Sequence, residues 1–202
     1  MPAPPLSMDE HLLEHRIGGR TLLSTGYLEV HRDEVRLPDG GQTTREYIKH
    51  SGAVAVIPLL DDGRCVLVRQ YRYPVGKILL EWPAGRREPG ESQIDCAVRE
   101  LREETGYTAR EWAYGGVVHN AAAYSTESIW LWFARGLVAG EKRPDAGEFV
   151  ETVLMTAAEL EAQSSAGSLP DVKTQIGLAW LARWQAGDRS LTWQSPQAAA
   201  SL

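Results

Sequence analysis

The segment from Ser92 to Gly106 constrains the fold of this chain most strongly, because it predicts a well-defined amphipathic helix. With about 100° between successive residues of a helix, one stripe collects the apolar side chains. These are Ile94, Val98, Leu101 and Thr105, with Ala97 beside them. Ser92 suits the N-cap, and Gly106 suits the left-handed position that follows many helices. We therefore expect a helix over Ser92–Thr105 whose apolar stripe is buried.

Three glutamates, Glu100, Glu103 and Glu104, lie together on the side of this helix away from the apolar stripe. The helix dipole disfavours carboxylates near its C-terminal end, and a like-charge pair four residues apart costs a few tenths of a kcal/mol. One interpretation is a solvated face with ion pairs to Arg99 and Arg102. The other is a metal site, because converging carboxylate oxygens are the ligands that Mg²⁺ requires.

The chain from Gly85 to Tyr107 reads GRREPGESQIDCAVRELREETGY and resembles the Nudix box. That motif combines a glycine, a glutamate, the pair Arg-Glu, an aliphatic residue, the pair Glu-Glu, a second glycine and a final aliphatic residue, at fixed spacings. Tyr107 takes the final aliphatic position and is the one departure. The other positions are matched by Gly85, Glu91, Arg99, Glu100, Leu101, Glu103, Glu104 and Gly106.

The resemblance extends beyond the motif, to the ADP-ribose pyrophosphatase branch of the Nudix superfamily. It is carried by Arg45–Pro58, Val68–Pro74 and Leu79–Gly85, and it covers roughly residues 20–185. In such relatives a small N-terminal β-domain helps to form a homodimer. Specific ADP-ribose pyrophosphatases tend to carry a proline at the position of Ala122. Another nucleoside diphosphate sugar, such as GDP-mannose, therefore stays open as the substrate.

The resemblance implies a reaction. The protein would be a Mg²⁺-dependent hydrolase, with Mn²⁺ as a substitute metal, that cleaves the pyrophosphate bond of a nucleoside diphosphate sugar. The expected substrate is ADP-ribose, which would give AMP and ribose 5-phosphate, and GDP-mannose or another such sugar is the alternative. A different class is a nucleotide sensor with this fold and no catalysis. Such sensors usually have a damaged motif, whereas every acidic position is present here.

The same resemblance assigns the metal and catalytic residues. The ligands would be the backbone carbonyl of Ala84 and the carboxylates of Glu100 and Glu104. Glu103 would be a further ligand or would bridge several metal ions, and it is counted among the catalytic residues as well. A bound divalent ion polarises a phosphoryl oxygen and helps to orient the attacking water. The base that activates this water is expected on a loop after the motif. We assign it to Glu148, with Glu151 in reserve.

Four residues are expected to bind the substrate. Arginine side chains match anionic oxygens bidentately, which points to Arg69 and Arg72 for phosphate or the terminal sugar. Arg45 is included with them. Glu81 is expected to accept hydrogen bonds from sugar hydroxyls.

Strand and helix patterns are mixed along the chain, which indicates an α/β or α+β fold. Ala53–Leu60 and Cys65–Gln70 predict a hairpin joined by Asp61-Asp62-Gly63. The resemblance implies a Nudix α/β/α sandwich with a mixed sheet and a small N-terminal antiparallel β-domain. We expect an N-terminal extension and β-meander over residues 1–51, used for dimerisation. The Nudix domain would follow over 52–190, with a disordered tail over 191–202.

Composition argues against several classes of function. The chain has 21 basic and 27 acidic residues and a net charge of −6, which disfavours binding to nucleic acid. Two cysteines, Cys65 and Cys96, provide neither a disulfide framework nor a zinc motif. The longest apolar stretch, Gly52–Leu60, is too short to cross a bilayer, and the N-terminal sequence lacks the layout of a signal peptide. We expect a cytoplasmic protein that binds a small nucleoside diphosphate compound and no membrane.

Overall fold

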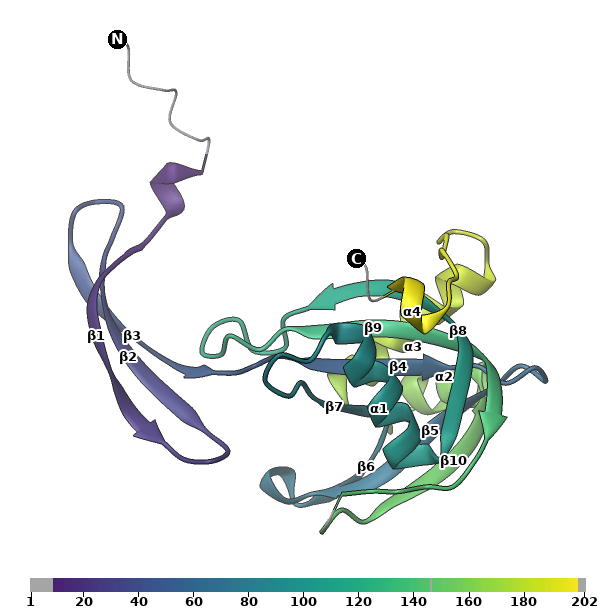
Figure 1. Ribbon diagram of the computed structural model, residues 1–202. Helices are drawn as coiled ribbons and strands as arrows, with labels where there is room; N and C mark the ends of the chain where they lie inside the picture. Colours follow the sequence, from purple (N-terminus) through teal and green to yellow (C-terminus); the bar gives the residue numbers. More distant parts are fainter. Residues whose placement is uncertain (1–8, 146, 200–202) are drawn as a thin grey trace. The chain divides into compact units, whose positions relative to one another are not determined.

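The computed structural model describes residues 9–145 and 147–199, which belong to two compact units. The first unit is the chain through His50 together with Ala121–Glu127. The second unit contains Ser51–Asn120 and the chain from Ser128 onward. Each unit has its own sheets, drawn in Figure 1.

The first unit is built on a three-stranded antiparallel sheet with the order β1-β2-β3. A short 3-10 helix, η1, precedes it, and the elements are η1 (Glu10–Leu12), β1 (His15–Ser24), β2 (Glu29–Arg36) and β3 (Gln42–Lys49). Between β2 and β3, the Asp39 carboxylate accepts a hydrogen bond from the N–H of Gly41 (2.8 Å), and Gly40 has a φ of 87°. The antiparallel meander expected in this region is present.

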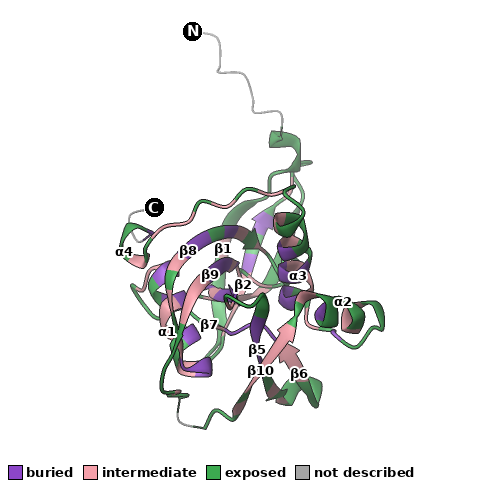
Figure 2. Cartoon of the chain, turned by 90° about the vertical axis from the view of Figure 1, so that its right-hand side faces the viewer, coloured by how far each residue is buried: buried purple, intermediate pink, exposed green. Residues whose placement is uncertain are grey.

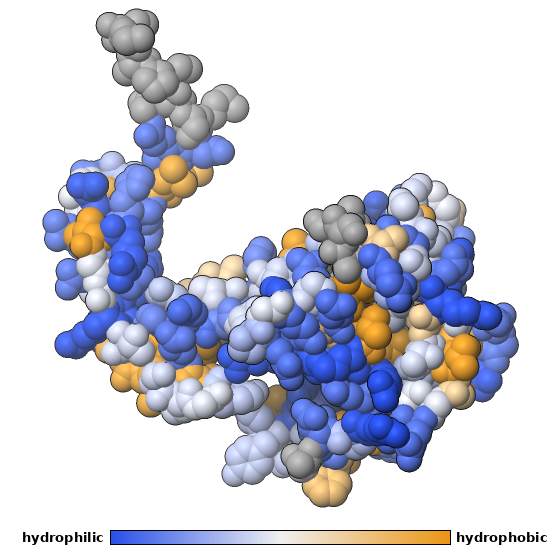
Figure 3. All heavy atoms as spheres, in the orientation of Figure 1, coloured by the Kyte–Doolittle hydropathy of each residue, from blue (hydrophilic) through white to orange (hydrophobic). Residues whose placement is uncertain are grey.

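This sheet has almost no core of its own. Among the described residues of the first unit, only Asp33 and Val35 are buried. Figure 3 shows hydrophobic side chains at the surface of this unit among hydrophilic ones. The exposed large apolar residues include Ile17, Leu22, Leu23, Tyr27 and Leu28. A three-stranded sheet without a buried face is marginally stable alone.

The second unit contains two sheets. One is four-stranded with the order β7-β4-β9-β8, and it is mixed because β4 and β9 are parallel while the outer pairs are antiparallel. Its strands are β4 (Ala53–Pro58), β7 (Ala84–Arg86), β8 (Tyr107–Val118) and β9 (Ile129–Ala139). The other sheet is antiparallel with the order β10-β5-β6. Its strands are β5 (Arg64–Arg72), β6 (Lys77–Glu81) and β10 (Val150–Thr156).

Helices pack on both faces of the four-stranded sheet. The helical elements of this unit are η2 (Tyr73–Val75), α1 (Gln93–Thr105), α2 (Ala157–Ser165), α3 (Val172–Gln185) and α4 (Pro196–Ala199). Val54 and Val56 of β4 share a buried cluster with the apolar stripe of α1, whereas Ala55 and Ile57 share another with α2 and α3. Buried residues in Figure 2 follow these strands and the inner side of α3. This arrangement confirms the expected α/β/α sandwich with a mixed sheet.

Strands β4 and β5 do not form the predicted hairpin, although the turn between them is present. The N–H of Leu60 donates to the carbonyl of Arg64 (2.8 Å), and Leu59 pairs with Cys65 in a single bridge. Beyond this bridge β4 belongs to the four-stranded sheet and β5 belongs to the β10-β5-β6 sheet. The prediction was wrong because a turn signal is local, whereas the parallel partner of β4 lies on the distant strand β9.

Of the C-terminal segment that the sequence predicts to be disordered, residues 191–202, the structure describes residues 191–199. Trp112 and Gln194 exchange two backbone hydrogen bonds of 2.8 and 2.9 Å. Trp193 packs against the core that contains α3, and Ala199 is buried with α1. These contacts join the segment to distant parts of the chain. Residues 200–202 lie outside the described part of the chain.

None of the helices in the described ranges is long and apolar enough to span a membrane.

Candidate active site

Helix α1 begins and ends where the sequence predicts. The hydroxyl of Ser92 accepts a hydrogen bond from the backbone N–H of Asp95 (3.1 Å), as an N-cap does. Gly106 has a φ of 79°, and a Cβ added there would lie 2.8 Å from the carbonyl oxygen of Gly140. Glycine is therefore required at this position both by the backbone conformation and by the close approach of a second segment.

The acidic side of α1 is largely buried, so the interpretation as a solvated face is wrong for two of its three glutamates. Glu100 is 8% exposed and Glu104 is 3% exposed, while Glu103 is half-buried. Helix α1 contacts β4 and β7 of one sheet and also β5 and β10 of the other. The second sheet therefore covers the side of α1 that the helical periodicity left open.

Strand β7, which precedes α1 in the chain, lies directly against these two carboxylates. The backbone N–H of Ala84 donates to Oε2 of Glu104 (2.9 Å). A Cβ added at Gly85 would lie 1.8 Å from Oε1 of Glu100, which is far too short for two non-bonded atoms. The missing side chain at Gly85 therefore lets the Glu100 carboxylate rest against the backbone. Ala84, Glu100 and Glu104, three of the predicted metal ligands, are brought together in this way.

Burial dominates the electrostatics of Glu100 and Glu104. It raises the pKa of Glu100 to about 7 and the pKa of Glu104 to about 8. Neighbouring negative charges raise both pKa values further, and the carboxylate of Glu148 acts on both groups. Arg99 opposes the shift at Glu100, as the N–H of Ala84 does at Glu104. Two buried carboxylates with like charges gain most from a bound cation.

Arg99 connects the loop to the helix. Its guanidinium donates to both oxygens of Glu91 (2.8 and 3.0 Å), to Glu100 (2.7 Å) and to Glu103 (3.0 Å). The hydrogen bonds from Arg99 lower the pKa of Glu91 to about 2, against the opposing effect of burial. Arg99 and Glu91 therefore fix the geometry of the site. The carboxylate of Glu103 faces this arginine in the structure.

Glu148 and Glu151, the two residues predicted as the base, lie in different surroundings. Glu148 is exposed on the loop before β10, and its charge acts on Glu100 and Glu104. Glu151 on β10 accepts a hydrogen bond from Arg69 on β5 (2.9 Å), and both side chains are exposed. Of the two, Glu148 is thus the carboxylate whose charge acts on Glu100 and Glu104.

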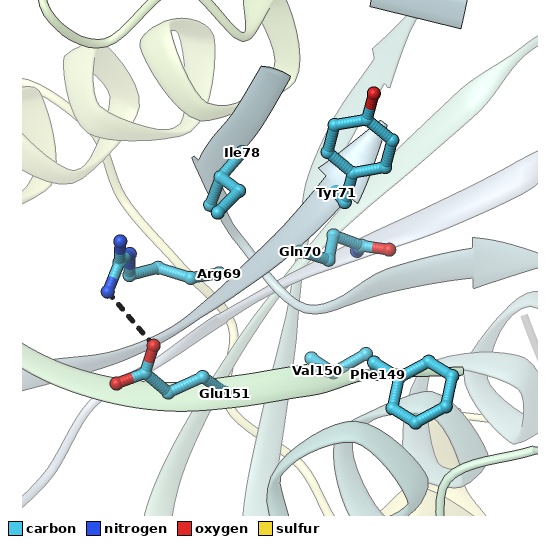
Figure 4. A pocket seen from close by; sticks show the side chains of 7 residues that line it. All are labelled: Arg69, Gln70, Tyr71, Ile78, Phe149, Val150 and Glu151. Atoms are coloured by element: carbon cyan, nitrogen blue, oxygen red, sulfur yellow. Dashed lines mark hydrogen bonds and ion pairs between the residues drawn. The ribbon is translucent and has the colours of Figure 1, made fainter. Parts of the chain in front are cut away.

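Arg69 and Glu151 line a surface cavity of about 440 Å³ on the β10-β5-β6 sheet. Figure 4 shows their ion pair, with the aromatic rings of Tyr71 and Phe149 elsewhere on its wall. The remaining lining residues are Gln70, Ile78 and Val150. With two exposed aromatic rings and one ion pair, this cavity is suited to bind a planar ring that carries polar groups at its edges.

Glu81, predicted to contact sugar hydroxyls, is fully buried and bound to cations of the protein. Arg72 donates from Nε to Oε1 (2.8 Å) and from Nη2 to Oε2 (2.7 Å), and the ammonium of Lys173 also contacts Oε2. Burial raises the pKa of Glu81, but the hydrogen bonds and charges of Arg72 and Lys173 outweigh burial and lower it. The carboxylate is therefore ionised, and both of its oxygens are bound by side chains of the protein. Its buried position comes from tertiary packing, which the sequence does not display.

Residues 49–173 match the family model described as the NUDIX domain. The chain belongs to the Nudix hydrolase family.

Two curated relatives and one solved structure illustrate the similarity. The ADP-ribose pyrophosphatase of Bacillus subtilis is 34% identical over 84% of this chain and 93% of its own length. The methanol dehydrogenase activator of Bacillus methanolicus is also 34% identical, over 83% of this chain and 92% of its own. A crystal structure of an ADP compounds hydrolase superposes with a TM-score of 0.78 at 20% identity. It covers 88% of this chain and 97% of that one, and it supports the fold.

Nudix hydrolases generally use a divalent metal ion, and the residues of this chain fit one. Within residues 9–145 and 147–199, no three His, Cys, Asp or Glu side chains form a cluster that would enclose a metal by itself. Mg²⁺ does not need one, because it commonly binds one or two carboxylates and takes waters and substrate phosphates as further ligands. Two carboxylates match that requirement: that of Glu100, which the missing Cβ of Gly85 accommodates, and that of Glu104, which accepts from the N–H of Ala84.

Two further residues, Arg45 and Lys173, complete the comparison with the sequence analysis. Arg45 lies in the first unit, where its guanidinium donates to the carboxylate of Glu14 (2.9 Å). The sequence analysis did not single out Lys173, which lies in the first turn of α3, two residues after its N-cap Asp171. A lysine is rarely buried without a partner, but only the fold brings Lys173 against Glu81.

Proposed function

We propose that this Nudix protein hydrolyses the pyrophosphate bond of a nucleoside diphosphate sugar in a Mg²⁺-dependent reaction, with ADP-ribose as the preferred substrate. One observation carries the proposal: two buried carboxylates lie against β7, that of Glu100 beside Gly85 and that of Glu104 on the backbone N–H of Ala84. The activity named for the Bacillus subtilis relative supports the choice of substrate. The products would be AMP and ribose 5-phosphate.

The roles of the residues follow from their positions. Glu100 and Glu104 would bind the divalent ion, with the carbonyl of Ala84 and with Glu103 as a further ligand. Once bound, the ion supplies positive charge that polarises the phosphoryl oxygens. Arg72 would bind a non-bridging oxygen of the diphosphate, because arginine matches such oxygens in geometry and charge.

Glu148 would accept the proton of the attacking water. The water oxygen forms a new bond to one phosphorus atom, and the bond from that phosphorus to the bridging oxygen breaks. The bridging oxygen leaves on the second phosphate. The charge of Glu148 already acts on Glu100 and Glu104, which supports this assignment over Glu151.

GDP-mannose or another nucleoside diphosphate sugar is the second candidate substrate. Ala122 favours it, because specific ADP-ribose pyrophosphatases tend to carry proline at that position. The cavity beside Arg69 and Tyr71 would take part of either compound, since it combines aromatic rings with an ion pair. Its residues do not distinguish adenine from guanine.

The experiment is a substrate panel of ADP-ribose, GDP-mannose and deoxynucleoside triphosphates with Mg²⁺, in which the released products are identified. ADP-ribose is expected to have the highest kcat/KM. A higher kcat/KM for GDP-mannose would establish the second candidate. Nucleotide binding without turnover of any compound would overturn the hydrolase proposal in favour of a sensor.

We also propose that the chain forms a homodimer through the first unit. Its sheet lacks a buried face, and apolar side chains on β1 are exposed. Such a sheet gains stability by packing on another surface. Residues 1–51 would form this dimerisation region and residues 52–190 the hydrolase domain.

A further inference from the structure

A buried cluster of charged side chains links the β10-β5-β6 sheet to helix α3. The side chain of Glu81 at the end of β6 is 1% exposed, and that of Lys173 in the first turn of α3 is 10% exposed. The side chain of Arg72 at the end of β5 is 38% exposed. One carboxylate is thus shared by a buried ammonium and a guanidinium that reaches solvent.

The carboxylate of Glu81 leaves one edge of Arg72 available. A guanidinium has five N–H groups, and Glu81 takes one from Nε and one from Nη2. No other acceptor in the described part of the chain is hydrogen-bonded to Arg72. Its remaining N–H groups can bind an anion while the first two stay attached to Glu81. The geometry therefore allows a fixed arginine to be an anion ligand at the same time.

The position of Lys173 is itself fixed from three sides. Its ammonium contacts Glu81 and also donates to Asp171 (2.9 Å), the N-cap of α3. The start of α3 is attached to the sheet by Trp82, whose backbone N–H donates to the hydroxyl of Thr174 (3.0 Å) and whose indole N–H donates to the carbonyl of Thr174 (3.1 Å). Lys173 is thus a rigid counter-ion, unlike a lysine on the surface.

Arg72 lies within electrostatic range of the candidate metal site. Its positive charge acts on the carboxylate of Glu104 and lowers the pKa of that group, against the larger effect of burial. Helix α1, which carries both glutamates, also packs against β5, the strand that ends at Arg72. Arg72 and the glutamate pair therefore belong to one packed region of the second unit, and a diphosphate has the charge to interact with Arg72 and with a cation bound to the glutamates.

We propose that Lys173 is a positioning residue for the diphosphate: it neutralises Glu81 together with Arg72 and thereby keeps Arg72 oriented with its free N–H groups available to the substrate. The inference rests on the proposed hydrolysis of a nucleoside diphosphate. Without the ammonium, Arg72 would be the single counter-ion of a buried carboxylate. Its charge would then be committed to Glu81, and the substrate would lose a charge-assisted hydrogen bond.

A double-mutant cycle tests this role. Lys173→Met is expected to raise KM for the best substrate of the panel about tenfold, the scale of one charge-assisted hydrogen bond, with kcat changed less than about threefold. Arg72→Met is expected to raise KM at least as much. In the Arg72→Met background, Lys173→Met should have little further effect, because Lys173 acts through Arg72. The matched control is Lys77→Met at an exposed lysine of β6, which should leave KM unchanged.

Two outcomes would overturn the proposal: an unchanged KM in Lys173→Met, or an equal rise in KM with and without Arg72. The second would show that Lys173 only stabilises the fold. Lys173→Gln, which keeps a hydrogen-bond donor but removes the charge, provides the same comparison if the methionine variant does not fold.

Activity of the wild-type protein is measured first, so that failure of the proposed function is recognised separately. If no compound of the panel is hydrolysed, the same cycle is measured as binding of inorganic pyrophosphate with Mg²⁺ by calorimetry. Weaker binding in Lys173→Met only when Arg72 is present supports the positioning role. Equal binding in all variants refutes it.

Discussion

At the scale of single residues, the site depends on side chains that are present and on one that is absent. Glu100 and Glu104 are buried beside β7, and Gly85 in that strand has no Cβ to displace the carboxylate of Glu100. Arg99 holds the loop and the helix in register through Glu91. Each of these contacts involves a position of the Nudix box, so the motif describes a three-dimensional arrangement as well as a ligand set.

Gly85→Ala is expected to lower kcat/KM by at least ~100-fold, the scale of a lost electrostatic contact in a transition state. The new Cβ would lie 1.8 Å from Oε1 of Glu100 and would displace that carboxylate. Steady-state kinetics measures the loss, and circular dichroism checks that the fold is kept. The matched control is Gly26→Ala, where an added Cβ meets no atom within 4 Å and should leave activity unchanged. Wild-type activity in Gly85→Ala would show that the close approach is not needed.

Glu148→Gln is expected to lower kcat by at least ~100-fold, the lower range for removal of a general base, with a small change in KM. Glu151→Gln provides the comparison, because Glu151 is paired with Arg69 and should affect KM more than kcat. Single-turnover rates with Mg²⁺ separate the two effects. If the Glu151 variant loses kcat and the Glu148 variant does not, the assignments are exchanged.

At the scale of elements, helix α1 and the two sheets that cover it determine the chemistry of the glutamates. The sequence predicted the bounds of α1 because its caps and periodicity are local signals. It did not predict the burial of Glu100 and Glu104, because that depends on β5 and β10 from distant parts of the chain. The contact of Lys173 with Glu81 was hidden for the same reason, since 92 residues separate them. The sequence thus predicted where a helix begins and ends, but not which elements pack against it.

The metal-free protein is expected to lose stability as pH rises from about 4.5 to about 8. Burial raises the pKa of Glu100 to about 7 and of Glu104 to about 8, from an ordinary value of 4.5 in the unfolded chain. In this window the folded state binds more protons than the unfolded state, so the free energy of unfolding falls as pH rises. Mg²⁺ binds the ionised carboxylates and should therefore stabilise the protein more at high pH than at low pH.

Denaturant titrations in EDTA and in Mg²⁺ across this range measure both effects. Glu104→Gln should show a weaker dependence on pH in EDTA and a smaller gain from Mg²⁺. A free energy of unfolding that rises with pH in EDTA would contradict the buried, raised pKa values.

At the scale of the whole molecule, the two units differ in how much they bury. The second unit has cores on both faces of its four-stranded sheet, whereas the sheet of the first unit leaves most of its apolar side chains exposed. The sequence indicated both regions, because the meander and the Nudix box have distinct patterns. It gave the wrong partner for β4, since the pairing of that strand depends on a long-range contact with β9.

Light scattering of the full chain is expected to give twice the chain mass of 22.3 kDa. Leu23→Asp should shift the mass toward that of one chain, because it places a charge on an exposed apolar position of β1. Thr44→Asp at an exposed polar position of β3 is the matched control and should stay dimeric. A wild-type mass of one chain would contradict the homodimer.

The most direct test of the account is a crystal soaked with Mn²⁺ and a non-hydrolysable ADP-ribose analogue, in which anomalous scattering locates the metal. The account predicts metal within bonding distance of the carboxylates of Glu100 and Glu104 and in contact with the diphosphate, and no metal at that place in crystals of Glu104→Gln. A bound nucleotide with no ion beside Glu100 and Glu104 in the wild-type crystal would contradict it.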